Sequence, residues 1–269
     1  MRIEKTLTVL LLGLTVACVT SPLGRKQLML VPDSQMDQMG AQAFDQLKQT
    51  TPADKDPATN KYVQCIVDAL APVTSPQTNV SKWDVVVFKD KQVNAFALPG
   101  GRIGVYDGIL SVAKTDAQLA AVLAHETGHV IAKHGGERVS QQAGTQLGLA
   151  ALGAISPNNP KSQMLLGLLG VGAQVGILLP FGRTQETEAD VIGIHDMAKA
   201  GFDPRHSVEL WKNMMAASGG GGPPEFLSTH PANQTRIDAL QAQMPQALQE
   251  YEAAKAAGRK PVCPRPDFK

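Results

Sequence analysis

The stretch AVLAHETGHVIAKH, residues 121–134, places three histidines and one glutamate within ten consecutive positions. Apolar residues recur around them at helical spacing, and Leu119, Val122 and Leu123 form one stripe. The pattern predicts a helix that packs against a core. Imidazole and carboxylate groups on such a helix are costly to bury without partners, so we expect them to bind something.

The two ends of this helix carry recognisable signals. Thr115 and Gln118 fit a capping box, and Asp116 falls in the first turn, where the helix dipole favours an acid. Gly135-Gly136 is expected to end the helix.

His125 and His129 are four residues apart, about 40° around a helix, so both rings project from one face. This geometry suits two ligands of one Zn²⁺, and Glu126 is placed to act as a general base on water. His134 lies about 140° from His129 on a continuous helix and cannot join the pair unless the helix breaks. We expect it at the surface or in support of a ligand.

A catalytic zinc ion needs a third protein ligand, and RTQETEAD, residues 183–190, offers three acids. Glu186 and Asp190 share one helical face, whereas Glu188 points away. Glu186 as ligand, with Asp190 orienting an imidazole, is the most economical assignment. A solvated acidic face is the other interpretation, and spacing alone leaves both open.

The fold class follows from the order of the patterns. Amphipathic helices come first, and two segments rich in Val, Phe and Ile (82–90 and 93–110) then fold back around a PGG turn. We predict an α+β, mostly helical fold with a small antiparallel sheet beside the histidine helix. The net charge of +1 and the absence of a basic cluster argue against a nucleic-acid partner.

The N-terminal residues resemble an export signal. Residues 1–17 have a basic start and a short apolar run, and TVAC ends in Cys18 like a bacterial lipobox. We expect lipidation of Cys18, a tether over 19–32, and anchoring on the periplasmic side of the envelope. Val19 after the cysteine favours the outer membrane. An ordinary cleaved signal is the alternative.

Three further features organise the chain. Cys65 and Cys263 are candidates for a disulfide in an oxidising compartment, fastening a C-terminal tail over 259–269. The main domain is expected over 33–258. Within it, residues 141–182 carry only one charge, Lys161, and predict an apolar helical hairpin that packs on the core or touches the bilayer.

HETGH, RTQETEAD and the late THPANQTRI together resemble the HtpX-like zinc endopeptidase family, which includes the CAAX prenyl endopeptidases. The resemblance covers roughly residues 35–250 and implies a zincin-type core. It implies one Zn²⁺ per chain held by His125, His129 and Glu186, with Glu126 as general base. A lipoprotein signal without evident transmembrane helices suggests the periplasmic branch.

The resemblance also assigns residues around the metal. His230 can approach it, stabilising an oxyanion or filling the fourth position at rest, and Arg236 pairs with an acid such as Asp190. NAFALPGGRIGV resembles the family's edge strand, so an extended substrate is expected to pair along one short segment, which comprises Asn94, Ala95, Phe96 and Ala97.

These expectations describe a zinc metalloendopeptidase that acts on unfolded or misassembled envelope proteins. The competing class is a non-proteolytic chaperone or assembly factor for outer-membrane proteins, with a structural zinc and contacts to the assembly machinery. Glu126 argues against it, because a structural metal site needs no general base.

Overall fold

The computed structural model describes residues 18–151, 181–217, 225–231 and 234–267. The predicted signal peptide and most of the predicted apolar hairpin lie outside these residues. The helices of the described part are α2 (Asp33–Thr50), α3 (Pro57–Thr78), the 3₁₀ helix η1 (Asp107–Ser111), α4 (Asp116–Ile131), α5 (His134–Ala151), α8 (Arg183–Lys199), α9 (Arg205–Ala217), α10 (Glu225–Thr229) and α11 (Gln234–Ala256).

Two small sheets accompany the helices, so the predicted mostly helical α+β class is confirmed. The strands are β1 (Cys18–Thr20), β2 (Lys26–Leu28), β3 (Asp84–Phe88), β4 (Ala95–Leu98) and β5 (Arg102–Tyr106). Strands β4 and β5 are antiparallel, as the PGG turn predicts. Strand β3 adds to β5 in parallel, so the sheet is mixed, with order β3-β5-β4 and β4 at one edge.

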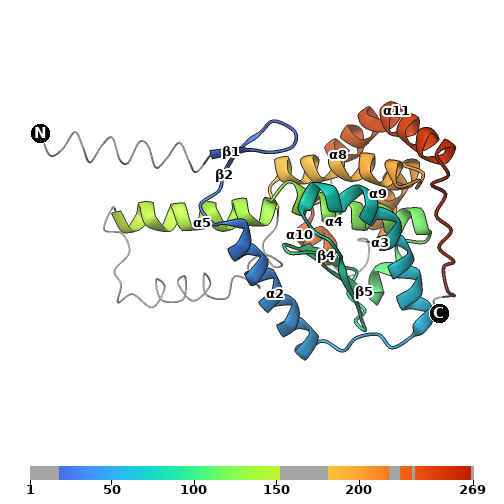
Figure 1. Cartoon of the computed structure of the whole chain (residues 1–269), viewed down its shortest axis with the longest axis horizontal. Coiled ribbons are helices and arrows are strands. Elements are labelled where there is room, and N and C mark those ends of the chain that lie inside the picture. Colours follow the sequence, from blue (N-terminus) through green and yellow to red (C-terminus); the bar gives the residue numbers. More distant parts are fainter. Residues whose placement is uncertain (1–17, 152–180, 218–224, 232–233, 268–269) are drawn as a thin grey trace, which may run out of the picture.

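Helix α4 is the centre of the molecule. The sheet and α3 pack on one part of its surface, while α8 and α9 pack on another and α11 covers α8 (Figure 1). Every residue from Ala117 to His129 is buried. A helix enclosed on all sides has no solvated face, so each polar side chain on it requires a partner inside the protein.

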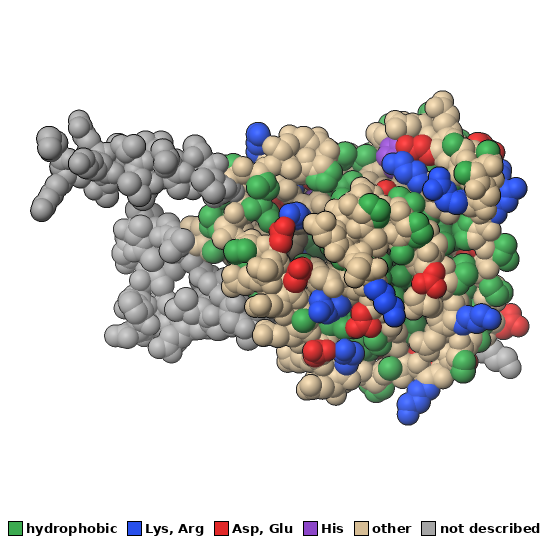
Figure 2. Space-filling model, in the orientation of Figure 1, with side chains coloured by type: hydrophobic (Ala, Val, Ile, Leu, Met, Phe, Trp, Pro, Cys, Tyr) green, Lys and Arg blue, Asp and Glu red, His purple; other side chains and the backbone are tan. Residues whose placement is uncertain are grey.

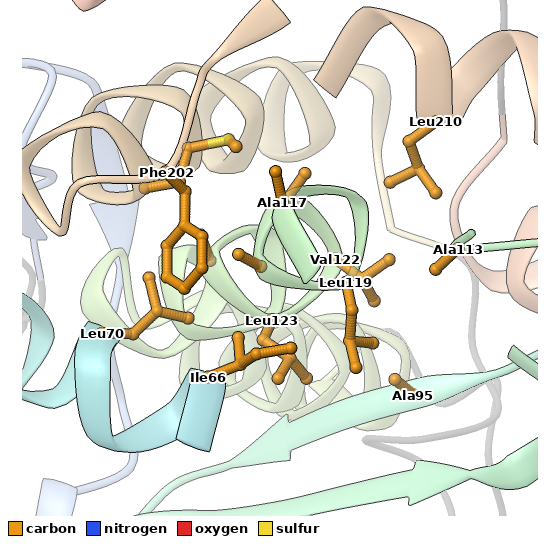
Figure 3. Close-up of a cluster of buried hydrophobic side chains, with 14 of the residues drawn as sticks. Ile66, Leu70, Ala95, Ala113, Ala117, Leu119, Val122, Leu123, Phe202 and Leu210 are labelled. Atoms are coloured by element: carbon orange, nitrogen blue, oxygen red, sulfur yellow. The ribbon is translucent and has the colours of Figure 1, made fainter. Parts of the chain in front are cut away.

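The apolar contacts around α4 join several segments of the chain. Leu119 and Leu123 are fully buried and meet Ile66 from α3, with Phe202 and Leu210 in the same cluster (Figure 3). Replacing one of these leucines by alanine would cost about 2–5 kcal/mol. This cluster fixes the helix that carries the histidines.

The start of α4 agrees with the predicted cap, but its end does not. Thr115 accepts a hydrogen bond from the backbone N–H of Gln118 at 3.1 Å. The helix ends at Ile131, before Gly135-Gly136, and the helical path is broken at Lys133, whose φ of 54° is left-handed. Both glycines lie within α5, so the prediction that they stop α4 is wrong.

Both ends of the described chain are fastened to the domain. Residues expected to form a tether instead include the β1–β2 hairpin, which contacts α5. A disulfide joins Cys65 of α3 to Cys263 of the C-terminal tail, while the thiol of Cys18 is free and exposed. Arg265 adds a hydrogen bond of 2.7 Å to the carbonyl of Leu110.

The surface shows no field of a single sign on the face drawn in Figure 2, where Lys and Arg alternate with Asp and Glu. Among the described residues, no helix is both long enough and apolar enough to cross a membrane.

Candidate metal centre

Close packing of α4 against α8 builds the centre. A Cβ atom on Gly128 would lie 2.9 Å from the carbonyl oxygen of Ala189, and one on Gly193 would lie 2.9 Å from the amide of His125. Real Cβ atoms do not approach backbone so closely, so both positions require glycine. The two backbones therefore meet directly, and side chains of α8 reach those of α4.

Four buried side chains converge at this crossing: His125, His129, Glu186 and His230. The Nε2 atoms of His125 and His129 are 3.1 Å apart. Glu186 places its carboxylate oxygens 3.5 Å from each of these nitrogens. The Nδ1 of His230 is 3.3 Å from His125 Nε2 and 3.0 Å from Glu186 Oε1.

These separations fit a metal ion. Nitrogen and oxygen ligands about 2.0–2.1 Å from one tetrahedral zinc ion lie about 3.3–3.4 Å from one another. Three imidazole nitrogens also face one another at these distances. Hydrogen bonds among them cannot satisfy every lone pair in the cluster, whereas a bound cation would. The donor set, three imidazoles and a carboxylate, is one that zinc prefers.

The charge around the ligands favours a cation. Burial lowers the pKa of His129 well below its ordinary value, and the charge of His125 adds to this, so the ring keeps a free lone pair. Burial also opposes charge on His125, but its hydrogen bonds with Asp190 and Glu186 outweigh it and raise the pKa to about 9. The same carboxylates stabilise a positive charge that a metal would supply.

Asp190 supports His125 from behind. Its Oδ1 is 3.0 Å from His125 Nδ1, on the side of the ring away from the ligand cluster. Burial would raise the pKa of Asp190, but the charge of Arg236 and the hydrogen bond to His125 hold it below its usual range. Arg236 also reaches Glu186, with Nη1 2.6 Å from Oε2.

His230 comes from the segment that follows α10. Its backbone N–H donates to the carbonyl of Phe226 at 2.8 Å, and the two rings stack with centroids 4.6 Å apart. While Nδ1 faces the ligands, Nε2 lies 3.4 Å from Glu126 Oε1. One imidazole therefore touches both the ligand cluster and the candidate base.

Glu126 has the environment that a general base needs. Its side chain is buried, and burial raises the pKa of its carboxyl above the ordinary value. Its Oε1 makes no hydrogen bond, although Nε2 of His230 lies 3.4 Å away. A desolvated carboxylate with a raised pKa is well suited to take up and release a proton.

The predicted substrate strand forms one border of a cavity of about 340 Å³. The cavity is lined by Ala97 and Leu98 of β4 and by Met36 of α2, and it extends to His129. Phe181 also lines this cavity and stacks on His129 with ring centroids 3.8 Å apart. Asn94, at the start of the segment, is buried and accepts from Tyr106 through its backbone carbonyl.

His134 was expected either at the surface or in support of a ligand, and its contacts agree with the second of these expectations. It is fully buried, and its Nδ1 lies 2.8 Å from Nδ1 of His129. The break at Lys133 interrupts the helix, so the separation of about 140° that a continuous helix would impose does not apply. A surface position is excluded. Glu188, which faces away from the metal ligands as expected, is buried against His134 at 3.1 Å.

Comparison with known proteins places these residues in context. The model of peptidase family M48 matches residues 57–244, which include α4, α8 and His230. The mitochondrial metalloendopeptidase OMA1 of Schizosaccharomyces pombe is 39% identical over 175 residues, covering 64% of this chain and 50% of the relative.

Two other relatives extend the comparison. The mitochondrial OMA1 of Bos taurus is 35% identical over 203 residues, 72% of this chain and 38% of the relative. The beta-barrel assembly-enhancing protease of Escherichia coli is 28% identical over 233 residues, 81% of this chain and 47% of the relative. The chain thus spans about half the length, or less, of the curated relatives it matches.

Proposed function

This chain belongs to peptidase family M48, and on that premise we propose that it is a zinc-dependent metalloendopeptidase. The observation that carries the proposal is the convergence of His125, His129 and Glu186 on one point, with the buried carboxylate of Glu126 beside it. A structural metal site would have no use for a desolvated base at its edge.

The roles follow from the geometry. His125, His129 and Glu186 would hold the metal, and zinc when bound acidifies a water molecule and polarises a peptide carbonyl. Glu126 takes a proton from the attacking water and delivers it to the leaving amine. His230, protonated at Nε2 next to Glu126, donates to the oxygen of the scissile carbonyl as negative charge develops there.

The substrate is a polypeptide in extended form. Strand β4 is an edge strand of its sheet, and its outer edge offers main-chain groups of the predicted segment with which an extended peptide can pair. Asn94 is not among them, because its backbone carbonyl already accepts from Tyr106. Pairing through the main chain carries little sequence preference. We therefore assign as substrates unfolded or misassembled polypeptides of the cell envelope, as in quality control.

The cellular site is part of the same proposal. The lipobox-like TVAC and the exposed thiol of Cys18 support lipidation, and the Cys65–Cys263 disulfide suits an oxidising compartment. We place the protein on the periplasmic side of a bacterial outer membrane. Incorporation of radiolabelled palmitate should occur in the wild type and be abolished in Cys18→Ala; labelling of both would contradict the assignment.

Cleavage of unfolded casein tests the catalytic proposal. Glu126→Gln removes the base, and we expect a rate loss of roughly 10²–10⁴-fold with zinc still bound. Glu209→Gln, the same chemical change at an exposed position of α9, is the matched control and should cleave like the wild type. Equal cleavage by Glu126→Gln and the wild type would exclude the peptidase mechanism.

Metal analysis tests the ligand set separately. His125→Ala and Glu186→Ala should each lose stoichiometric zinc. Full zinc content in Glu186→Ala would move the third ligand elsewhere. Equal rescue of an envelope defect by the wild type and Glu126→Gln would favour the chaperone alternative.

A further inference from the structure

The ring of His134 is held between a metal ligand and a carboxylate. It is the first residue of α5, its side chain is fully buried, and its Nδ1 lies 2.8 Å from Nδ1 of His129. On the other side of the ring, Nε2 lies 3.1 Å from Oε2 of Glu188. Each nitrogen of His134 thus has one partner.

Only one arrangement of protons satisfies this chain with both rings neutral. His129 directs Nε2 at the other ligands, so its proton must be on Nδ1, from which it donates to Nδ1 of His134. His134 then carries its proton on Nε2 and donates to Glu188. In the reverse arrangement, the bare Nε2 of His134 would face a carboxylate, and Nε2 of His129 would carry a proton where a metal must bind.

Glu188 is fixed in turn by a residue far away in sequence. Arg25 donates to Oε2 of Glu188 from Nε at 3.1 Å and from Nη2 at 3.0 Å. Its Nη2 also donates to Glu137 at 2.7 Å. Both carboxylates are almost completely buried, so Arg25 is the charge that makes their ionised form tolerable.

Arg25 stands immediately before β2, and the same strand supports the break between α4 and α5. The side chain of Gln27 donates to the carbonyl of Ala132 at 2.7 Å, at the C-terminus of α4. The hairpin lies beside α5 (Figure 1). It therefore contacts both the turn that positions His134 and the acid that orients it.

We propose that His134 is a positioning residue for the metal ligand His129, and that the β1–β2 hairpin, through Arg25 and Glu188, holds it in place. The inference rests on the proposed function, since it assumes that the cluster binds zinc. It makes the N-terminal residues 18–28 part of the metal centre. Groups that orient a ligand typically contribute 10–100-fold to metal affinity or activity.

Zinc affinity, measured by competition with a chelating dye, and the visible absorption of the Co²⁺-substituted protein test the proposal. His134→Leu keeps the volume and removes the acceptor for His129, and we expect zinc affinity to fall roughly 10–100-fold with an altered cobalt spectrum. His134→Asn places an amide oxygen near the position of Nδ1. It should restore affinity to within a few-fold of the wild type and recover the cobalt spectrum.

The hairpin is tested by Arg25→Ala, which should also lower zinc affinity. Lys26→Ala is its matched control, because the neighbouring Lys26 is exposed and its ammonium donates to the hydroxyl of Thr20 within the hairpin. Wild-type affinity and spectrum in His134→Leu, or equal effects of Arg25→Ala and Lys26→Ala, would overturn the proposal. If His134→Leu does not fold, His134→Asn and Arg25→Ala decide.

The result is separable from the proposed function. A wild type that binds zinc but hydrolyses no peptide would contradict the peptidase activity and leave the positioning role intact. If the enzyme is active but its zinc affinity is unchanged by substitution of His134 or Arg25, only the positioning role would be contradicted.

Discussion

Arg236 holds Asp190 through two hydrogen bonds, from Nε to Oδ2 at 2.6 Å and from Nη2 to Oδ1 at 2.7 Å. Asp190 in turn faces Nδ1 of His125. Because Arg236 belongs to α11, the last helix of the domain fixes the orientation of a ligand on α4. On the opposite side of the centre, His134 likewise faces Nδ1 of His129. The two imidazoles proposed as metal ligands, His125 and His129, are thus supported by different terminal parts of the domain.

Replacing the planar guanidinium of Arg236 by a single ammonium group should lower the affinity of the centre for zinc. Lysine cannot make two parallel hydrogen bonds to Asp190 while also reaching Glu186, so Arg236→Lys should lower zinc affinity about 10–100-fold. A chelator competition titration measures this. Arg205→Lys, which alters an exposed pair with Asp203, is the control. A change below about twofold in Arg236→Lys would show that positive charge alone suffices.

Removal of His230 separates its two candidate roles. Three protein ligands remain in His230→Ala, so zinc should stay bound. The loss of one donor to the developing oxyanion should lower kcat by roughly 10²–10³-fold on casein peptides. His206→Ala, at a partly exposed histidine of α9 outside the ligand cluster, should leave kcat unchanged. A rise in activity on removing His230 would instead mean that its imidazole blocks the fourth metal position at rest.

Local patterns predicted much of this centre. The cap at Thr115, the shared face of His125 and His129, and the shared face of Glu186 and Asp190 depend on helical periodicity, which the sequence expresses directly. The close approach of two helices that are far apart in sequence, by contrast, depends on tertiary packing. Three ordered motifs of a known family supplied that pairing.

The break after Ile131 could not be predicted, because nothing local marks Lys133 for a left-handed conformation and the glycines nearby offered a better candidate. Distant contacts stabilise it, among them the hydrogen bond from Gln27 to Ala132. The hairpin of residues 18–28 was missed for a related reason. Strands of three residues carry no alternation to detect, and Arg25 finds its acidic partners more than one hundred residues away.

Asp196 should make stability depend on pH in an unusual direction. Burial raises the pKa of its carboxyl from 3.8 to about 6, although Gln77 donates to both oxygens at 3.1 Å. The folded state then holds a proton that the unfolded state releases between pH 4 and 6. The contribution of protonated Asp196 to the free energy of unfolding is therefore fully present below pH 4 and is lost as the pH rises through 6.

Asp196→Asn removes that loss, so the variant should be more stable than the wild type by ~2–3 kcal/mol at pH 8. The advantage should shrink as the pH approaches 4. Urea unfolding of the metal-free proteins at several pH values measures the difference, with Asp68→Asn on the exposed face of α3 as control. An advantage that stays constant with pH would mean that Asp196 is not the titrating group.

A single methyl group at Gly128 should disturb the metal centre from a distance. Its Cβ would meet the carbonyl of Ala189 at 2.9 Å, and both atoms belong to helical backbone that cannot rotate away. Helix α8 must therefore shift, moving Glu186 and Asp190 relative to His125. Alanine is otherwise favoured over glycine in a helix by about 1 kcal/mol. We therefore expect Gly128→Ala to be destabilised by ~1–3 kcal/mol and to bind zinc more weakly. Because helix propensity acts in the opposite direction, this loss would be due to the packing of α4 against α8.

The contrast with another glycine makes this prediction sharp. Gly144 also lies in a helix, but its nearest neighbour to an added Cβ is the flexible end of Leu28 at 3.5 Å, an ordinary contact. Gly144→Ala should therefore leave zinc affinity unchanged and keep or raise the free energy of unfolding. If Gly128→Ala behaved in the same way, the distance between α4 and α8 would not control the ligand geometry, and the carboxylates of α8 would have to follow the imidazoles by side-chain rotation.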